Sequence, residues 1–236
     1  MPDLVDDLRH RIAEAGDPAK APQMRAYMRS DLPYRGVTSV PLRAILREVI
    51  PRHPLLDRTA WEGTVRRLWD EAEYREEWYA ALAVARHRQY RAYQDVDTLA
   101  LYRDLVVSGA WWDVVDDIAG HLVGDILAAD PGQVTPVMRA WAVDENIWLR
   151  RTAILCQIGR KGGTDTALLR FALTENLEDS PHGHTFWIRK AVGRALRQQA
   201  RVDPDWVRSF VSEHDQDMSG LPRREALKHI GPTEEG

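Results

Sequence analysis

The amino-acid sequence predicts an all-α protein, and two kinds of observation support that prediction. Apolar residues recur with the i, i+3, i+4 spacing of an amphipathic helix, as at Leu99, Tyr102 and Val106. Residues that begin or end helices also recur along the chain, whereas the alternating apolar and polar pattern of strands is scarce. Together these signals predict about a dozen helices of roughly 10–16 residues, joined by short connections.

Each expected helix has a local signal of its own. Proline is favoured in the first turn of a helix, aspartate caps the N-terminus, and glycine or proline marks the connections. In chain order, the helix signals are a start at Pro41, one face at Trp61, Val65, Leu68 and Trp69, an N-cap at Asp95 before the 99–106 face, a start near Trp111, a start at Asp130-Pro131, and one face at Ile147, Ile154 and Ile158. The expected breaks are Ser108-Gly109, Gly162-Gly163 and residues 181–183.

Similar segments recur in the C-terminal half of the chain. The segment 148–155 resembles 187–196 and 221–230, and each carries a basic pair near its start. The pairs lie roughly 34 to 39 residues apart, which is the scale of a two-helix solenoid repeat. Stacked helix pairs of this kind form a curved array with a concave surface. The repeat therefore predicts an α-solenoid.

The basic pairs are candidates for binding phosphate. Equivalent positions in a repeat lie on one edge, so we expect a row of basic side chains there. Cations near a helix N-terminus oppose the helix dipole, so three recurrences favour a phosphate ligand. The alternative is a row of solvated charges. The pairs are Arg150 with Arg151, Arg189 with Lys190, and Arg223 with Arg224.

Composition excludes several classes of protein. The 236 residues carry a net charge of −4, which argues against a generally basic nucleic-acid binder but leaves room for a basic groove. The sequence has no apolar run long enough to span a membrane, and its acidic N-terminus is unlike an export signal. The single Cys156 excludes an internal disulfide and favours the reducing cytosol. Arginines far outnumber lysines, which fits either a GC-rich genome or bidentate phosphate binding.

The segment from Trp111 to His121 has the densest group of chemically capable side chains. A helix beginning near Trp111 places Trp112 and Asp116 at i, i+4 on one face. An indole and a carboxylate together suit a substrate that develops positive charge, such as the sugar oxocarbenium ion of glycosidic cleavage. Core packing for the indoles and helix capping for the carboxylates are the alternatives.

Motifs for metals and cofactors are missing from the sequence. Asp113, Asp117 and His121 have i, i+4, i+8 spacing, but the sequence has no HExxH motif and no second histidine nearby on that helix. It also lacks a P-loop, GxGxxG and GxSxG, and Cys156 lies in an apolar stretch typical of a core. We therefore expect neither a metal nor a cofactor.

At these motifs the sequence resembles the AlkD family of bacterial DNA glycosylases, which are built from HEAT-like helical repeats. The resemblance runs from about Asp3 to Ile230, and its carriers are residues 22–28, 68–70, 111–116, 124–126, 146–155 and 224–230. It implies a right-handed α-solenoid of HEAT-like helix pairs with a concave DNA-binding face. It also implies one domain over residues 1–236, with the last few residues disordered.

The resemblance implies a function as well. Members of the family excise cationic N3- and N7-alkylated purines from double-stranded DNA without flipping the base into a pocket. The implied protein is a monofunctional glycosylase, a cytoplasmic monomer that works at the bacterial nucleoid without a cofactor, a metal or a membrane. Bulky adducts are further candidate substrates, because no pocket has to enclose the base. A DNA-binding repeat protein without excision activity and a protein-interaction solenoid are the alternatives.

The resemblance also assigns roles to residues. Asp116 corresponds to the catalytic carboxylate, Trp112 to an indole that packs on the sugar of the lesion, and Arg151 to an arginine that holds the adjacent phosphate. Further expected DNA contacts are Tyr27, Thr38 in a loop that is one residue longer than in the family, Trp148, Arg150, Arg189, Lys190 and Arg194.

One position departs from the family pattern. The family has a second catalytic tryptophan where this chain has Arg194, at the end of the stretch 188–194. Trp187 aligns with an ordinary apolar position and does not replace that tryptophan. We expect Arg194 to hold phosphate or to stack on a sugar or base.

Overall fold

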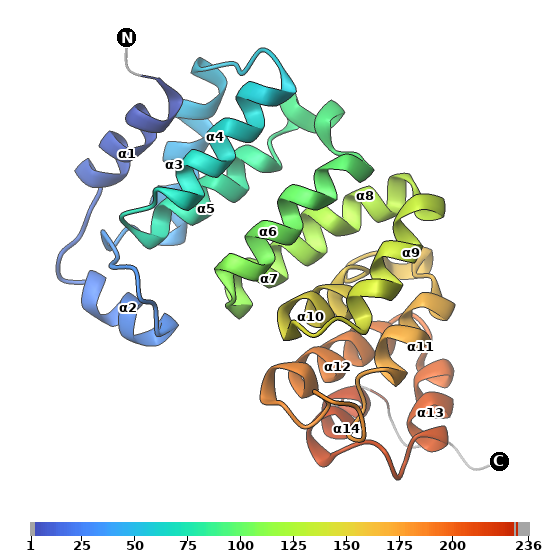
Figure 1. Cartoon of the computed structure of the whole chain (residues 1–236). Coiled ribbons are helices and arrows are strands. Elements are labelled where there is room, and N and C mark those ends of the chain that lie inside the picture. The colour runs from blue at the N-terminus through green and yellow to red at the C-terminus, as the bar shows by residue number, and fades with distance from the viewer. Residues whose placement is uncertain (1–2, 229, 231–236) are drawn as a thin grey trace. The chain divides into compact units, whose positions relative to one another are not determined.

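The computed structural model describes residues 3–228 and 230, and all regular secondary structure in these residues is helical (Figure 1). The prediction of an all-α protein is thereby confirmed. The chain divides into two compact units, residues 1–93 and 94–236. The single domain expected over residues 1–236 stays a prediction, and the expected disorder at the C-terminal end concerns residues outside the described part.

The first unit contains five α-helices in its described residues. Helix α1 packs on α3 and α4, and α4 packs on α5, around a core that includes Leu8, Trp61 and Leu68. Trp69 and Trp78 stack with ring centroids 4.5 Å apart. The helices are α1 (Leu4–Glu14), α2 (Ala21–Met28), α3 (Ser39–Val49), α4 (Arg58–Asp70) and α5 (Arg75–Ala85). The apolar face expected at 61–69 is the buried face of α4.

The loop before α3 is held by a buried carboxylate. Glu76 on α5 accepts hydrogen bonds from the backbone N–H groups of Arg35, Gly36 and Val37 at 3.0–3.1 Å. These bonds fix the approach to Thr38, the extended residue that precedes α3. Helix α3 begins at Ser39, so Pro41 lies within its first turn, where a missing N–H costs no hydrogen bond.

Replacing Gly36 with alanine is expected to lower the free energy of unfolding by about 1–3 kcal/mol. Gly36 has φ +86°, and a Cβ there would lie 2.1 Å from the backbone oxygen of Asp17. Gly63→Ala in α4 is the control, because its Cβ would meet no atom within 4 Å; there we expect an unchanged or higher stability. Urea unfolding measures both variants, and equal effects would contradict the prediction.

The second unit contains nine α-helices in its described residues. Helix α10 contacts α6, α7, α9 and α12, and α12 packs closely on α14. The helices are α6 (Leu99–Gly109), α7 (Trp112–Asp117), α8 (Gly124–Ala129), α9 (Pro131–Ala142), α10 (Ile147–Leu155), α11 (Thr166–Thr174), α12 (Phe186–Gln199), α13 (Pro204–Glu213) and α14 (Gly220–Leu227). The three helices that contain the repeated segments therefore pack in order, α10 on α12 and α12 on α14.

Helix starts in the second unit follow the sequence signals closely. The Asp130 side chain accepts the N–H of Gln133 at the start of α9, and Asn146 accepts the N–H groups of Trp148 and Leu149 at the start of α10. Asp95 caps a short 3₁₀ turn that leads into α6. Helix α7 continues into a π-helical segment, Ile118–Val123, which the sequence did not predict.

Cys156 lies in the core of the second unit, as its apolar neighbours predict. It is fully buried, and burial raises the pKa of its thiol to about 12. The raised value keeps the thiol protonated far above neutral pH, and the thiolate is the reactive form. We expect Cys156 of the native protein to resist a thiol reagent at pH 8 and to react once urea unfolds the chain. Rapid labelling of the native protein would contradict this assignment.

Candidate functional site

Helix α7 presents Trp112 and Asp116 away from the core of the second unit. Val114 and Val115 are fully buried and anchor the helix, whereas Trp112 and Asp116 are only partly covered as residues. The i, i+4 spacing places the indole and the carboxylate on the same face, as expected. The Asp116 side chain itself is 9% exposed, so its carboxylate lies in a largely water-excluded place.

Arg151 on α10 binds the Asp116 carboxylate in a bidentate arrangement. Its Nε donates to Oδ1 at 2.7 Å and its Nη2 donates to Oδ2 at 2.9 Å. The remaining nitrogen, Nη1, donates to the backbone carbonyl of Trp187 at 2.6 Å. The Arg151 side chain is 5% exposed, so both its geometry and its burial hold it in place. Planar pairing of this kind fixes the orientation of a carboxylate.

Arg194 on α12 brings a second guanidinium to the same carboxylate. Its Nη1 donates to Oδ2 of Asp116. The Arg194 side chain is 42% exposed, in contrast to that of Arg151. Within the described residues, Asp116 therefore contacts two cations, one buried and one at the surface. The sequence predicted that Arg194 belongs to the site but did not predict its ion pair with Asp116.

Three tryptophans pack together beside the carboxylate, and we call Trp111, Trp148 and Trp187 the tryptophan cluster. Their ring centroids lie 5.2–6.3 Å apart, and Phe186 meets Trp187 edge to face at 5.0 Å. The Arg151 guanidinium carbon lies 5.9 Å from the centroid of the Trp187 ring. Trp187 therefore connects the cluster to Arg151.

Two members of the cluster differ from their expected roles. Trp148 was expected to contact DNA, but its side chain is buried in the cluster. Trp187, expected to be an ordinary apolar residue, also supplies the carbonyl that holds Arg151. Trp148 and Trp187 are the first residues of the two similar segments 148–155 and 187–196. This match is the signal in the sequence that could have predicted their contact.

Arg150 lies in the core of the second unit and not at a basic surface, so we do not carry its expected contact with DNA into the proposal below. Its side chain is buried and donates to the carbonyl groups of Val143, Asp144 and Glu175 and to the side-chain oxygen of Asn176, at 2.5–3.2 Å. Burial lowers the pKa of the Arg150 guanidinium from its usual value. Arg150 therefore connects the end of α9 to the end of α11. Arg151, the next residue on α10, points in a different direction, because adjacent residues on a helix cannot both face the same side.

The other basic pairs also have individual environments. Arg189 pairs with Glu178, and the Lys190 ammonium lies 5.8 Å from the centroid of the Phe186 ring. Arg223 pairs with Asp215 at 2.8 Å, whereas Arg224 is exposed. Arg150 and Arg151 thus break the uniform row of basic side chains that the repeat predicted, because one is buried in the core and the other binds Asp116.

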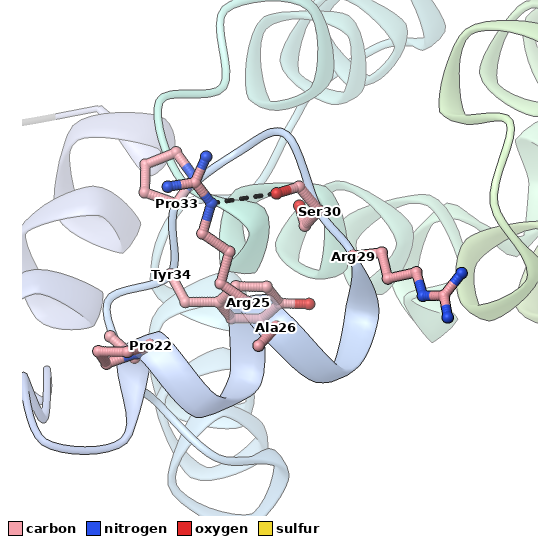
Figure 2. Close-up of a pocket in the computed structure, with 8 residues that line it drawn as sticks. Pro22, Arg25, Ala26, Arg29, Ser30, Pro33 and Tyr34 are labelled. Carbon is pink, nitrogen blue, oxygen red and sulfur yellow. Dashed lines mark hydrogen bonds between the residues drawn. The ribbon is translucent and has the colours of Figure 1, made fainter.

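Tyr27 and Thr38 belong to the first unit. Tyr27 on α2 is 76% exposed, and Thr38 is exposed at the start of α3. Beside α2 lies a pocket of about 530 Å³, in which Arg25 donates to the backbone carbonyl of Ser30 (Figure 2). Arg25 also donates to the backbone carbonyl of Asp31. The pocket is lined by Ala21, Pro22, Arg25, Ala26, Arg29, Ser30, Pro33 and Tyr34. Tyr27 is therefore available to a partner of α2.

The described residues contain no group of three or more histidine, cysteine, aspartate or glutamate side chains placed to hold a metal ion. His121 Nε2 lies 3.9 Å from Asp117 Oδ1, and the histidine side chain is exposed. No described helix is long and apolar enough to cross a membrane.

Comparisons with known proteins agree with this fold. The family model described as DNA alkylation repair enzyme matches residues 8–230. A solved structure described as a predicted DNA alkylation repair enzyme from Enterococcus faecalis has a TM-score of 0.81 and 25% sequence identity, and the match covers 92% of this chain and 97% of that chain. A search among curated proteins finds no significant match. The chain therefore belongs to the DNA alkylation repair enzyme family.

Proposed function

We propose that the protein is a monofunctional DNA glycosylase that hydrolyses the N-glycosidic bond of cationic N3- and N7-alkylated purines in duplex DNA. The observation that carries the proposal is the Asp116 carboxylate, 9% exposed and oriented by a bidentate arginine beside Trp112. A fixed, desolvated carboxylate stabilises developing positive charge far better than a solvated one does. The family membership supports a role in DNA repair.

The proposed reaction needs little proton transfer. An alkylated purine carries a positive charge and leaves as a neutral base, so no general acid is required. The deoxyribose then carries the charge, and Asp116 stabilises this oxocarbenium-like state and positions the attacking water. Trp112 packs on the sugar, and its π face attracts the cation. Water, rather than a lysine, is the nucleophile, so the products are the free base and an abasic site.

Arg151 and Arg194 divide two tasks in this proposal. The resemblance gave Arg151 the adjacent phosphate, yet all three of its guanidinium nitrogens already donate within the protein. We therefore assign Arg151 to holding and orienting Asp116. The more exposed Arg194 is the better candidate for the phosphate. Tyr27, Thr38, Arg189 and Lys190 remain proposed DNA contacts.

The proposed partner is alkylated double-stranded DNA, and the proposed form is a cytoplasmic, nucleoid-associated monomer that uses neither cofactor nor metal. Because the mechanism needs no enclosing pocket, bulky purine adducts are included as substrates without base flipping.

The test is base release from three duplexes, carrying N7-methylguanine, N3-methyladenine and a bulky N3-adenine adduct. We expect free base and intact abasic strands at rates well above spontaneous depurination. Release at the spontaneous rate from all three would overturn the proposal. Strand cleavage before any alkaline treatment would contradict a monofunctional enzyme.

A second candidate function is favoured by the contact between Arg194 and Asp116, because a cation on the carboxylate opposes catalysis. The protein would then bind DNA without excising bases. Arg194→Trp separates the two: a disabled enzyme gains most of its activity from this change, whereas an enzyme that is active beforehand excludes the second function. A salt titration of DNA binding tests a third possibility, a protein-interaction solenoid, for which no steep dependence is expected.

A further inference from the structure

Asp116 is held by two arginines that differ sharply in how firmly they are fixed. Arg151 donates three hydrogen bonds and is almost fully buried. Within the described residues, Arg194 makes a single hydrogen bond, to Asp116, and its side chain is 42% exposed. Arg151 is therefore a fixed part of the site, and Arg194 is the partner that a ligand is able to displace.

The two arginines together neutralise the carboxylate. A bidentate guanidinium already occupies one edge of the carboxylate, on both oxygens. Arg194 donates a further hydrogen bond to Oδ2, so two positive charges lie against the single negative charge of Asp116. With both in contact, Asp116 has little attraction left for a cationic sugar. Removing Arg194 takes away the excess positive charge and frees its position on Oδ2, and Arg151 still orients the carboxylate.

The backbone of α12 cannot easily move to release Arg194. At the preceding residue, Gly193, a Cβ would lie 2.9 Å from Cβ of Glu225 and 3.1 Å from Cα of Pro222, so α12 and α14 are in close contact. One turn further on, Arg197 pairs with Glu225 and holds the same two helices together. Release of Asp116 therefore occurs by rotation of the Arg194 side chain.

We propose that Arg194 is an exchangeable counter-ion: a DNA backbone phosphate takes its guanidinium from Asp116, and this exchange uncovers the carboxylate for the cationic sugar. One anion replaces another, so the exchange involves no covalent step, and phosphate accepts a guanidinium at least as well as carboxylate does. The part of this inference that concerns the sugar rests on the proposed glycosylase function. Arg194 would then free this side of Asp116 for the cationic sugar only when a duplex is bound, while Arg151 stays in place.

A double-mutant cycle on binding of undamaged duplex DNA tests the exchange without requiring catalysis. Asp116 and phosphate compete for Arg194, so Asp116→Asn is expected to raise affinity by about fivefold or more, within the range for directly contacting groups. Most of that gain should vanish when Arg194 is glutamine. The matched control is Arg197→Gln, which removes an arginine of similar exposure on the same helix, also paired with a carboxylate. If Asp116→Asn raised the affinity for DNA equally in the Arg194→Gln and Arg197→Gln variants, the inference would be overturned.

Salt dependence supplies a second measurement that does not need the Asp116 variant. Arg194→Gln is expected to reduce the slope of log K against log salt by about one, the value for one lost phosphate contact, and Arg194→Lys should restore it. An unchanged slope would also overturn the inference.

Single-turnover excision then links the exchange to the reaction. Because Arg194→Gln loses the contact with phosphate, the DNA concentration needed for half-saturation should rise about tenfold, the cost of one charge-assisted hydrogen bond. An unchanged half-saturation concentration would contradict the exchange. If the wild type excises no base but the binding cycle behaves as expected, the glycosylase function fails and the phosphate exchange stands.

Discussion

Replacing Asp116 with asparagine is expected to slow base release from an N7-methylguanine duplex by about 10²–10³-fold. Asparagine has almost the same size but no negative charge, so it cannot oppose the positive charge that develops on the sugar. The loss should appear in the single-turnover rate at saturating DNA, because the missing interaction belongs to the transition state.

Two controls accompany this experiment. Asp113→Asn changes a carboxylate in the first turn of the same helix, and we expect its rate to stay within about threefold of the wild type. Asp116→Asn also leaves the buried Arg151 without its counter-ion, which is destabilising. Its melting temperature is therefore measured first, and the assay is run well below it. A folded Asp116→Asn variant with nearly wild-type excision would contradict the proposed mechanism.

The second large effect concerns stability. Arg150→Met is expected to lower the free energy of unfolding by about 2–4 kcal/mol, because several buried acceptors lose their charged donor. The change removes the donor of four hydrogen bonds, three of them to backbone carbonyls at the ends of α9 and α11 or just after them. Without Arg150, these buried oxygens would have neither a protein donor nor bulk water to bind, which destabilises the folded state.

Urea unfolding of the wild type and the variant measures this effect. Arg224→Met is the control, because Arg224 is exposed and its loss should change stability by no more than about 0.5 kcal/mol. A loss under about 1 kcal/mol for Arg150→Met would show that the network contributes little.

The helical class could be predicted from the sequence because it depends on local signals. The apolar face at 61–69 and the helix start at Asp130 depend on residues within one or two helical turns, and the structure confirms helices there. The π-helical segment Ile118–Val123 was not predictable in this way, since its residues keep ordinary helical composition.

The site was predictable only in part. Trp112 and Asp116 are neighbours on one helix, so spacing alone suggests them as a pair. The partners of Asp116 come from 35 and 78 residues away, and only the packing of α7, α10 and α12 brings them together. No local pattern separates Arg150 from Arg151 either, although one lies in the core and the other at the carboxylate.

The most direct test of the proposed role of Asp116 compares a cationic with a neutral leaving group. Wild type and Asp116→Asn are incubated with two duplexes that differ only in one base, N7-methylguanine or hypoxanthine, and the released base is quantified. Stabilisation of positive charge by Asp116 predicts release of N7-methylguanine by the wild type, strong loss of that release in Asp116→Asn, and no release of hypoxanthine by either, since a neutral base needs protonation that this site does not supply. Release of N7-methylguanine at the same rate by both proteins, or at the spontaneous rate by the wild type, would contradict it.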